Sequence, residues 1–375
     1  MKSAMQFELI HSDGDSRAGI MTTAHGAIET PAFMPCGTIG AVKAVRWCEL
    51  EELGYQLVLV NALHLYLRPG VDVVRGFGGV HDFTTWKRSV LADSGGYQFF
   101  SLKGLYKIDE GGVTFQSPYD GSSHRFTPES LIDLQVALGS DLIMPLDHCA
   151  PGDASRERII EAGERTVDWL IRAAKRFGEI GDDSQALFGI VQGGVHIDLR
   201  KQYLERSAAL HLPGYALGGI SVGEEHAQGD EVVREIAPLM PSDKPRYLMG
   251  VGLPDQILDA VSAGIDMFDC VLPTRMARNG TLFTSQGRVN ITNARFKSDP
   301  VPLDPKCSCP ACRRYSRAYL AHLYKVGDPG VLGLLSLHNL AHYWTLVREA
   351  REAILANRFG TWKAEMMAAC SALPE

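Results

Sequence analysis

The segment Met267-Phe-Asp-Cys-Val-Leu-Pro-Thr-Arg-Met-Ala-Arg-Asn-Gly280 begins as a short apolar strand and breaks at Pro273. Asp269 lies inside the apolar part, where a carboxylate is costly to bury unless it has partners or a chemical role. Arg275 and Arg278 follow shortly after it, and guanidinium groups match the geometry of phosphate. Two interpretations are open: a structural Asp–Arg pair that closes a strand, or a functional carboxylate beside a phosphate-bearing substrate.

Seven further apolar runs precede this one. They are Ala32-Phe-Met, Gln56-Leu-Val-Leu-Val, Val90-Leu-Ala, Leu142-Ile-Met-Pro-Leu, Leu187-Phe-Gly-Ile-Val, Tyr215-Ala-Leu and Arg246-Tyr-Leu-Met. Stretches with helical spacing lie between several of them, as over residues 128–138, 155–177 and 254–263. Short apolar runs that alternate with helices are typical of parallel strands buried on both faces. Eight such units predict a closed (β/α)8 TIM barrel. The alternative is an open doubly wound sheet, but its usual Gly-x-Gly-x-x-Gly motif is absent after the first run.

Two segments interrupt the repeat. Residues 99–126 resemble a β-hairpin insertion, and residues 281–345 carry three closely spaced cysteines. Because no linker or low-complexity tract separates these segments from the repeat, we expect one domain over residues 1–375, with 281–345 as a subdomain within it. No run approaches the ~18 apolar residues of a membrane span, and the N-terminus lacks the apolar region of a signal peptide. We therefore expect a cytoplasmic protein with no membrane partner.

The charge is unevenly distributed. The whole chain has a net charge of −7, which argues weakly against a nucleic-acid partner. From Arg275 to Arg317, however, nine basic and only two acidic residues give a local charge of +7. Such a segregated patch is the electrostatic footprint of a polyanion site. The alternative is a solvated basic face without a ligand.

Cys307, Cys309 and Cys312 place three thiols within six residues, and His338 follows downstream. Three thiolates and one imidazole make a closed tetrahedral set that suits Zn²⁺. Since protein groups fill every position, we expect one structural zinc ion. His342, one helical turn beyond His338, is the alternative fourth ligand.

Polar residues end the third to eighth apolar runs, where a barrel of this type builds its site. The segments are Asp93 to Gln98, Asp147-His148-Cys149, Gln192-Gly193-Gly194, Gly218 to Glu224, Met249 to Gly252, and Asp269. Asp and Gln side chains with glycine N–H groups can read the edge of a planar heterocycle, on which Tyr97 or Met249 can stack. Two further carboxylates allow acid/base and nucleophilic roles at an N-glycosidic bond. Taken singly, the glycine pairs are also explained as tight turns and Asp93 as a helix cap.

Five motifs now resemble those of the tRNA-guanine transglycosylases, also called queuine tRNA-ribosyltransferases. They are Asp93-Ser-Gly-Gly-Tyr-Gln, Gly189-Ile-Val-Gln-Gly, Arg246-Tyr-Leu-Met-Gly-Val-Gly, Phe268-Asp-Cys-Val-Leu-Pro-Thr-Arg, and Cys307-x-Cys-x-x-Cys with His338. The resemblance covers nearly the whole chain. It implies a (β/α)8 barrel with a zinc-binding, tRNA-contacting subdomain, and a homodimer. It also implies exchange of guanine for a 7-deazaguanine at the wobble position of tRNAs with a GUN anticodon (those for Asp, Asn, His and Tyr), a step of queuosine biosynthesis.

The resemblance also implies roles for single residues. Asp269 is then the nucleophile that forms a covalent aspartyl-ribosyl intermediate, and Asp93 is the general acid/base. Arg275 and Arg278 contact the anticodon loop. The base-binding residues are Asp93, Ser94, Tyr97, Asp147, Cys149, Gln192, Gly219, Ile220, Met249 and Gly250.

Cys149 and Val222 match the bacterial pattern, whose members insert the aminomethyl base preQ1. Two alternatives remain open: a queuine-inserting enzyme of eukaryotic type, and a catalytically silent tRNA-binding subunit of the same fold. A carbohydrate-active barrel is more remote, because it gives the zinc segment no role. The sequence departs from the bacterial pattern at His148, where Glu is usual, and at Gly219-Ile220, where the pattern reads Gly-Gly-Leu.

Overall fold

The computed structural model describes residues 5–97 and 106–371. Within these ranges, eight parallel strand positions make a ring. The fifth position is divided into two short strands, β11 and β12. The strands are β4 (Ala32–Pro35), β5 (Leu57–Asn61), β6 (Ser89–Asp93), β10 (Leu142–Ile143), β11 (Ala186–Leu187), β12 (Gly189–Val191), β13 (Tyr215–Leu217), β14 (Arg246–Leu248) and β15 (Met267–Cys270). Each coincides with one of the predicted apolar runs.

Backbone contacts close this ring at two places. The orders β11-β10-β6-β5 and β12-β13-β14-β15-β4 form two parallel sheets. A bridge between Cys36 and Leu59 joins the ends of β4 and β5. On the opposite side, Phe188 N donates to the Ile143 carbonyl while the next residue, Gly189, donates to the Gly214 carbonyl. The barrel is therefore closed, and the predicted (β/α)8 fold is confirmed in place of an open sheet.

Side-chain alternation along the strands separates an interior core from an outer one. Leu57 and Leu59 of β5 belong to the interior cluster, whereas Val58 and Val60 belong to the cluster between strands and helices. The N-terminal antiparallel sheet of β1 (Gln6–Asp13), β2 (Ser16–Thr23) and β3 (Gly26–Thr30) adds Met21 to the interior cluster. This sheet therefore packs against the barrel interior.

Helices surround the barrel. They are α1 (Trp47–Leu53), α2 (Ala62–Leu67), α3 (Val71–Gly76), α4 (Val80–Thr84), α6 (Pro128–Leu138), α7 (Arg156–Ile180), α8 (Ile197–Ala208), α9 (His226–Ile236), the 3-10 turn η1 (Ala237–Leu239), α10 (Pro254–Ser262) and α11 (Leu272–Arg278). The predicted insertion contains a three-stranded antiparallel sheet of β7 (Tyr106–Asp109), β8 (Gly112–Gln116) and β9 (Ser123–Phe126). It is thus one strand larger than a hairpin, and its first predicted residues lie outside the described ranges.

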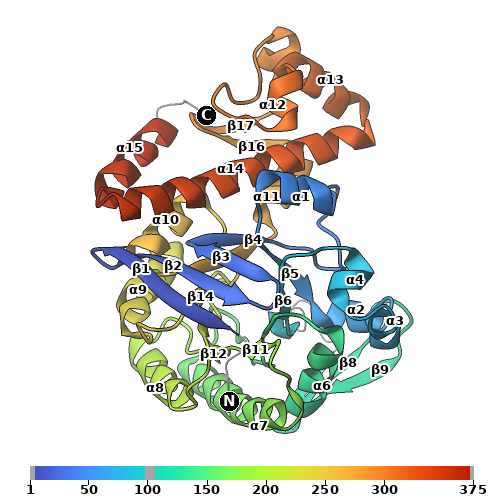
Figure 1. The fold of residues 1–375 in the computed structure, drawn as a ribbon, viewed down its shortest axis with the longest axis vertical. Helices are drawn as coiled ribbons and strands as arrows, with labels where there is room; N and C mark the ends of the chain where they lie inside the picture. Colours follow the sequence, from blue (N-terminus) through green and yellow to red (C-terminus); the bar gives the residue numbers. More distant parts are fainter. Residues whose placement is uncertain (1–4, 98–105, 372–375) are drawn as a thin grey trace.

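The C-terminal elements gather at one end of the barrel, in orange and red in Figure 1. They are β16 (Thr281–Thr284), β17 (Gly287–Asn290), η2 (Ala294–Ser298), α12 (Pro310–Arg314), α13 (Arg317–Val326), α14 (Pro329–Leu355) and α15 (Phe359–Ser371). A separate apolar cluster that includes Leu282, Leu303 and Leu335 packs this region together. Among the described helices, none has the length and apolar character needed to cross a bilayer.

Candidate active site and metal centre

Polar side chains continue the inward-facing rows of the barrel at the carboxyl ends of its strands. Interior residues Leu59, Leu91, Ile190 and Met267 are each followed two positions later by a polar residue: Asn61, Asp93, Gln192 and Asp269. Because alternate residues of a strand face the same side, these four side chains converge on one mouth of the barrel. Three of these four residues, Asp93, Gln192 and Asp269, are predicted site residues, and the structure brings them to the same end of the barrel.

Asp269 is held by three donors in or just after the two strands that flank β15, namely β14 and β4. Its Oδ1 accepts hydrogen bonds from Tyr247 Oη at 2.6 Å and from Gly250 N at 2.9 Å. Its Oδ2 has one weaker donor, Cys36 Sγ at 3.5 Å. Burial raises the pKa of Asp269, and these hydrogen bonds oppose the increase. The carboxylate is thus fixed through one oxygen, and the other is less tightly held.

Asp93 has a different environment. Asn61 Nδ2 donates to its Oδ2 at 2.7 Å, across the neighbouring strands β5 and β6. Burial raises the pKa of Asp93 to about 7, and the nearby carboxylates of Asp147 and Asp269 add to the increase. A carboxyl group with this pKa can both accept and donate a proton near neutral pH.

Asp147 and Gln192 form a buried polar pair. Gln192 Nε2 donates to Asp147 Oδ2 at 2.7 Å. Burial raises the pKa of Asp147 to about 6, against the lowering effect of this hydrogen bond. A Cβ atom at Gly219, whose φ is +63°, would lie 2.2 Å from Gln192 Oε1. The glycine therefore leaves room for the amide, as the predicted base-reading edge requires.

Most of the other predicted pocket residues lie within a few sequence positions of Asp93, Asp147 or Gly219. Ser94 is buried and its Oγ accepts from Gly96 N at 3.2 Å. Cys149 is half-buried, and burial followed by the Asp147 charge raises the pKa of its thiol. Ile220 is buried in the outer core, whereas Met249 packs against the interior cluster. Tyr97 is 51% exposed, so its predicted stacking opposite Met249 remains a prediction.

Arg275 and Arg278 lie in the last turn of α11, directly after β15. Arg275 is exposed and Arg278 is partly buried. The Nη1 atom of Arg278 is buried and has no hydrogen-bond partner among the described residues. Burial, and then the charge of Arg275, lowers the pKa of Arg278.

Four supporting residues were not anticipated from the sequence: Cys36, Asn61, Arg200 and Tyr247. Arg200 is fully buried and donates to the carbonyls of Val191, Gly194 and Gly219 at 3.1, 2.7 and 3.1 Å. It therefore fixes the loops after β12 and β13 to each other. Every second residue of a barrel strand faces the interior. Following this pattern along β5 and β14 would have identified Asn61 and Tyr247. No local signal marks Arg200, because its partners are backbone carbonyls.

The predicted metal ligands meet in space. The ligand atoms of Cys307, Cys309, Cys312 and His338 all lie within 4.8 Å of one another. His338 Nδ1 is 3.3 Å from Cys312 Sγ and 3.7 Å from Cys309 Sγ. Its Nε2 lies 2.9 Å from the Phe283 carbonyl. A carbonyl only accepts, so Nε2 carries the proton and Nδ1 is left as a metal ligand. The set fits a tetrahedral metal ion such as Zn²⁺.

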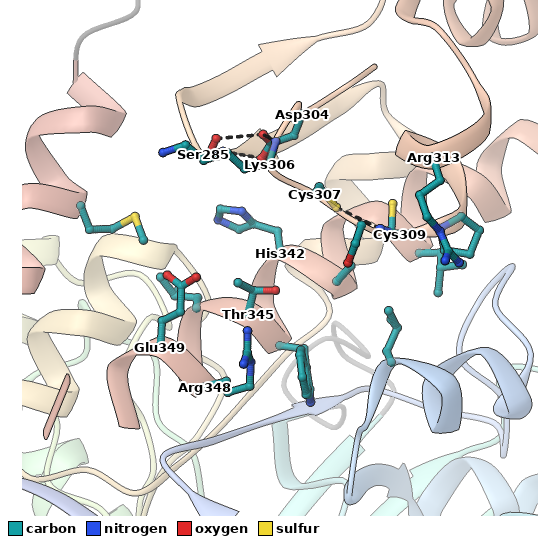
Figure 2. A pocket seen from close by; sticks show the side chains of 18 of the residues that line it. Ser285, Asp304, Lys306, Cys307, Cys309, Arg313, His342, Thr345, Arg348 and Glu349 are labelled. Carbon is teal, nitrogen blue, oxygen red and sulfur yellow. Dashed lines mark hydrogen bonds between the residues drawn. The ribbon is translucent and has the colours of Figure 1, made fainter. Parts of the chain in front are cut away.

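His342 is on the same helix but outside this group. Its ring stacks on Phe283, with centroids 6.0 Å apart. It lines a cavity of about 650 Å³ between α1, α14, α15 and the cysteine loop. Figure 2 shows the imidazole of His342 pointing into this cavity. The geometry therefore favours His338 over His342 as the fourth ligand.

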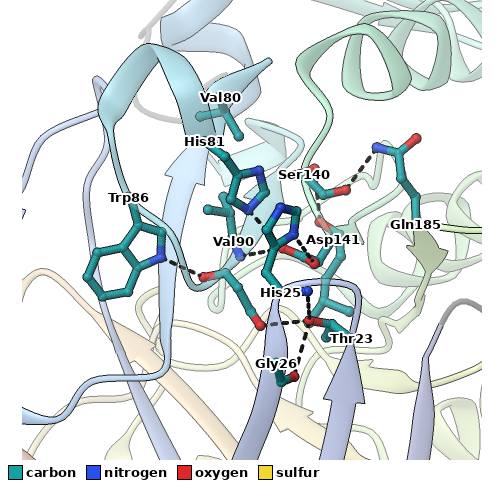
Figure 3. A network of polar contacts seen from close by, with 12 residues as sticks. Thr23, His25, Gly26, Val80, His81, Trp86, Val90, Ser140, Asp141 and Gln185 are labelled. Atoms are coloured by element: carbon teal, nitrogen blue, oxygen red, sulfur yellow. Dashed lines mark hydrogen bonds and ion pairs between the residues drawn. The ribbon is translucent and has the colours of Figure 1, made fainter. Parts of the chain in front are cut away.

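A second group of possible ligands, His25, His81 and Asp141, joins the β2–β3 turn, α4 and the residue before β10 (Figure 3). His25 Nδ1 and His81 Nε2 lie 2.8 and 3.0 Å from the two Asp141 carboxylate oxygens. The two rings stack face to face, with centroids 3.6 Å apart and planes 11° from parallel. An imidazole binds a metal through a lone pair in its ring plane, and two separated parallel planes do not meet at one ion. This cluster is therefore a hydrogen-bonded contact between the N-terminal sheet and the barrel.

Comparisons with known proteins agree with this geometry. The family model described as queuine tRNA-ribosyltransferase matches residues 13–372. The chain is 50% identical over 365 residues to a queuine tRNA-ribosyltransferase of Koribacter versatilis, covering 95% of each chain. It is 49% identical over 368 residues to that of Solidesulfovibrio magneticus, covering 98% of each. With a closed barrel, a strand-end carboxylate site and a Cys3His cluster, the chain belongs to the queuine tRNA-ribosyltransferase family.

Proposed function

We propose that the protein exchanges guanine at the wobble position of GUN-anticodon tRNAs for preQ1. Asp269 attacks C1′ of the ribose, the glycosidic bond breaks, and guanine leaves with a proton from Asp93. The covalent aspartyl-ribosyl intermediate is then attacked by preQ1, which gives its proton to Asp93. The exchange is thus divided into two displacements that together retain the configuration at C1′.

The observation that carries this proposal is the contrast between the two carboxyl groups. Asp269 has one oxygen fixed by Tyr247 and Gly250, which favours the charged, nucleophilic form. Asp93 has a pKa of about 7, suited to transferring a proton near neutral pH. Burial raises the pKa of both groups, but hydrogen bonds oppose the increase at Asp269 whereas neighbouring carboxylates add to it at Asp93. Such a difference in environment divides the nucleophilic role from the acid/base role.

The base pocket supports the same reaction. Asp147, Gln192 and the Gly219 backbone offer acceptors and donors for the edge of a purine-like base. Ser94, Tyr97, Cys149, Ile220, Met249 and Gly250 complete the proposed pocket. Arg275 and Arg278 lie in the last turn of α11, which follows the strand that carries Asp269, and the exposed guanidinium of Arg275 is available to a phosphate. These two side chains are the proposed contacts to the anticodon loop.

The C-terminal region has a supporting role in this proposal. Cys307, Cys309, Cys312 and His338 would hold one structural Zn²⁺ and shape residues 281–345 as the tRNA-contacting subdomain. When bound, the ion contributes folding energy. We further propose a homodimer acting in the cytoplasm, where its tRNA substrate is found.

The test is incorporation of radiolabelled guanine or preQ1 into unmodified tRNA-Tyr, with a denaturing gel run in parallel. Wild-type protein should incorporate both bases and give a gel-stable protein–tRNA band. Asp269→Asn should abolish incorporation and the band while tRNA still binds, because an amide is a poor nucleophile. Asp255→Asn, on the exposed surface of α10, is the matched control and should behave like wild type.

Three results would change the assignment. Substantial turnover by Asp269→Asn would disprove the nucleophilic role of this carboxylate. Binding of tRNA by the wild-type protein without incorporation would indicate a silent subunit. Incorporation of queuine but not preQ1 would indicate the eukaryotic substrate preference.

A further inference from the structure

The wall of the base pocket that carries Asp147 has little regular structure of its own. β10 is two residues long, and the described segment 144–155 contains no helix or strand. A loop of this kind holds a functional group in place only through anchors from neighbouring elements. The anchors of the next residue, His148, therefore bear directly on the position of Asp147.

His148 is buried and held through two hydrogen bonds to α7. Its backbone N donates to Thr166 Oγ1 at 3.0 Å. Its Nδ1 lies 2.9 Å from Arg165 Nη1. A guanidinium only donates, so Nδ1 must be the acceptor and the imidazole is neutral. Burial, and then the Arg165 charge, lowers the pKa of His148 to about 4, which agrees with this geometry.

The same guanidinium reaches the inserted sheet. Arg165 Nη2 donates to Glu110 at 2.7 Å and to Glu161 at 2.9 Å. Glu110 lies in the turn between β7 and β8, and its carbonyl accepts from Trp169 Nε1 at 3.0 Å. Arg165 thus joins three parts of the molecule: α7, the insertion and the Asp147 wall.

The opposite side of Asp147 is confined as well. A Cβ atom at Gly96 would lie 2.0 Å from Asp147 Oδ1, so the backbone after β6 packs directly on this carboxylate. Gln192 holds its other oxygen. Asp147 therefore lies between the backbone at Gly96 and the amide of Gln192. His148, held by Arg165, anchors the loop that carries it. A shift of about 1 Å in such a group weakens its hydrogen bonds to a ligand severely.

We propose that His148 and Arg165 are a positioning pair that holds Asp147 at the separation needed to bind the incoming base. The pair acts through Asp147 and touches no reacting atom, so it sets the affinity for the base rather than the rate of chemistry. The role requires a neutral hydrogen-bond acceptor at position 148. This inference rests on the proposed function, which makes Asp147 a base-binding group.

The test compares His148→Leu with His148→Gln in full-length protein. Leucine fills similar space without an acceptor, whereas the glutamine carbonyl can still accept from Arg165. We expect His148→Leu to raise KM for preQ1 and guanine about tenfold, with kcat within about twofold of wild type. His148→Gln should restore KM to within about twofold. Glu161→Gln removes the charge of a second Arg165 partner but keeps a carbonyl that can accept from the guanidinium; it is the matched control and should leave KM unchanged.

A wild-type KM in folded His148→Leu, or an equally raised KM in His148→Gln, would overturn the proposal. If His148→Leu does not fold, Arg165→Lys provides the same test, because one ammonium group cannot bridge His148 and Glu110 as the guanidinium does. It should raise KM, and an unchanged KM would again contradict the role. Failure of the proposed function is recognised separately, since wild-type protein would then incorporate neither base.

Discussion

At the residue scale, the hydrogen bond from Tyr247 to Asp269 sets the charge state of the proposed nucleophile. Tyr247→Phe removes the 2.6 Å bond without changing the shape of the ring. We expect kcat to fall about ten- to a hundredfold, since a hydrogen bond to a charged group contributes about 1.5–3 kcal/mol. The bond lowers the pKa of Asp269, so its loss raises that pKa. The acid limb of the kcat–pH profile should therefore move to higher pH.

Tyr55→Phe is the matched control for this variant. Tyr55 is equally buried, and its hydroxyl donates to the Leu340 carbonyl at 2.8 Å, away from the carboxylates. Its pH profile should match that of wild type. An unshifted acid limb in Tyr247→Phe would show that this bond does not control the ionisation of Asp269.

A second prediction at this scale concerns Gly219. Gly219→Ala places a Cβ 2.2 Å from Gln192 Oε1 and also strains a backbone with φ +63°. Displacing the Gln192 amide should raise KM for the base about tenfold or more. Gly14→Ala also places an alanine in the left-handed region, with φ +61°, but its Cβ has no neighbouring atom within 4 Å. It should lose about 1 kcal/mol of stability without changing KM, and equal KM values in the two variants would contradict the collision with Gln192.

At the scale of elements, the Cys3His cluster joins the loop before α12 to the long helix α14. We expect the purified protein to contain one zinc per chain by elemental analysis. Cys309→Ser and His338→Ala should lose the metal, and the region around Leu303 and Leu335 should lose protection from hydrogen exchange.

His342→Ala distinguishes the two candidate histidines. Since His342 lies on a cavity wall outside the ligand group, this variant should keep the full zinc content. Exposed Cys48, changed to serine, should keep it as well. A metal-free His342→Ala with a metal-loaded His338→Ala would show that the fourth ligand had been assigned wrongly.

A further prediction for elements concerns Asp141, which fastens the β2–β3 hairpin to the barrel. Burial raises the pKa of Asp141, but hydrogen bonds from His81, His25 and Val90 N outweigh it, so the pKa lies below its ordinary value. A lowered folded-state pKa contributes stability above the unfolded-state pKa of about 4. Asp141→Asn should therefore lower the free energy of unfolding by about 2–4 kcal/mol at pH 7.

Urea titrations at several pH values test this prediction. The difference between wild type and Asp141→Asn should shrink as the pH falls below about 4, where Asp141 becomes protonated in the unfolded chain, and should vanish at lower pH, where the folded carboxylate is protonated too. Asp72→Asn, at an ion pair whose carboxylate is 90% exposed, should change stability by less than about 0.5 kcal/mol. A pH-independent difference for Asp141→Asn would indicate that lost packing, rather than lost charge, causes the effect.

At the scale of the whole molecule, charge segregation predicts how tRNA binding responds to salt. The chain carries −7 overall, yet the segment from Arg275 to Arg317 is strongly basic. Binding constants should fall linearly on a logarithmic scale as salt rises, because phosphate contacts release counterions. Changing both Arg275 and Arg278 to Ala should reduce the slope by about one to two. Fluorescence anisotropy between about 50 and 200 mM salt measures this, and Arg75→Ala, at an exposed ion pair on α3, should leave the slope unchanged.

The sequence by itself determined the barrel and the identity of the strand-end residues. Eight short apolar runs, the last six of them ending in predicted site residues, are local patterns, and all eight became strands. The cysteine spacing likewise identified three candidate metal ligands, because they lie within one loop and the first turn of α12. Such features follow from hydrophobic burial and from residue alternation, which act over a few neighbouring positions.

The tertiary structure alone decided how these residues support one another. Tyr247 reaches Asp269 only because β14 and β15 pair in one register, and Arg165 bridges His148 and Glu110 only because α7 packs against both. The choice of His338 over His342 depends on which face of α14 meets the cysteine loop. These contacts join positions far apart in the chain, and they are set by barrel closure and helix packing. No local pattern records that geometry, since the same residue types would suit a different register equally well.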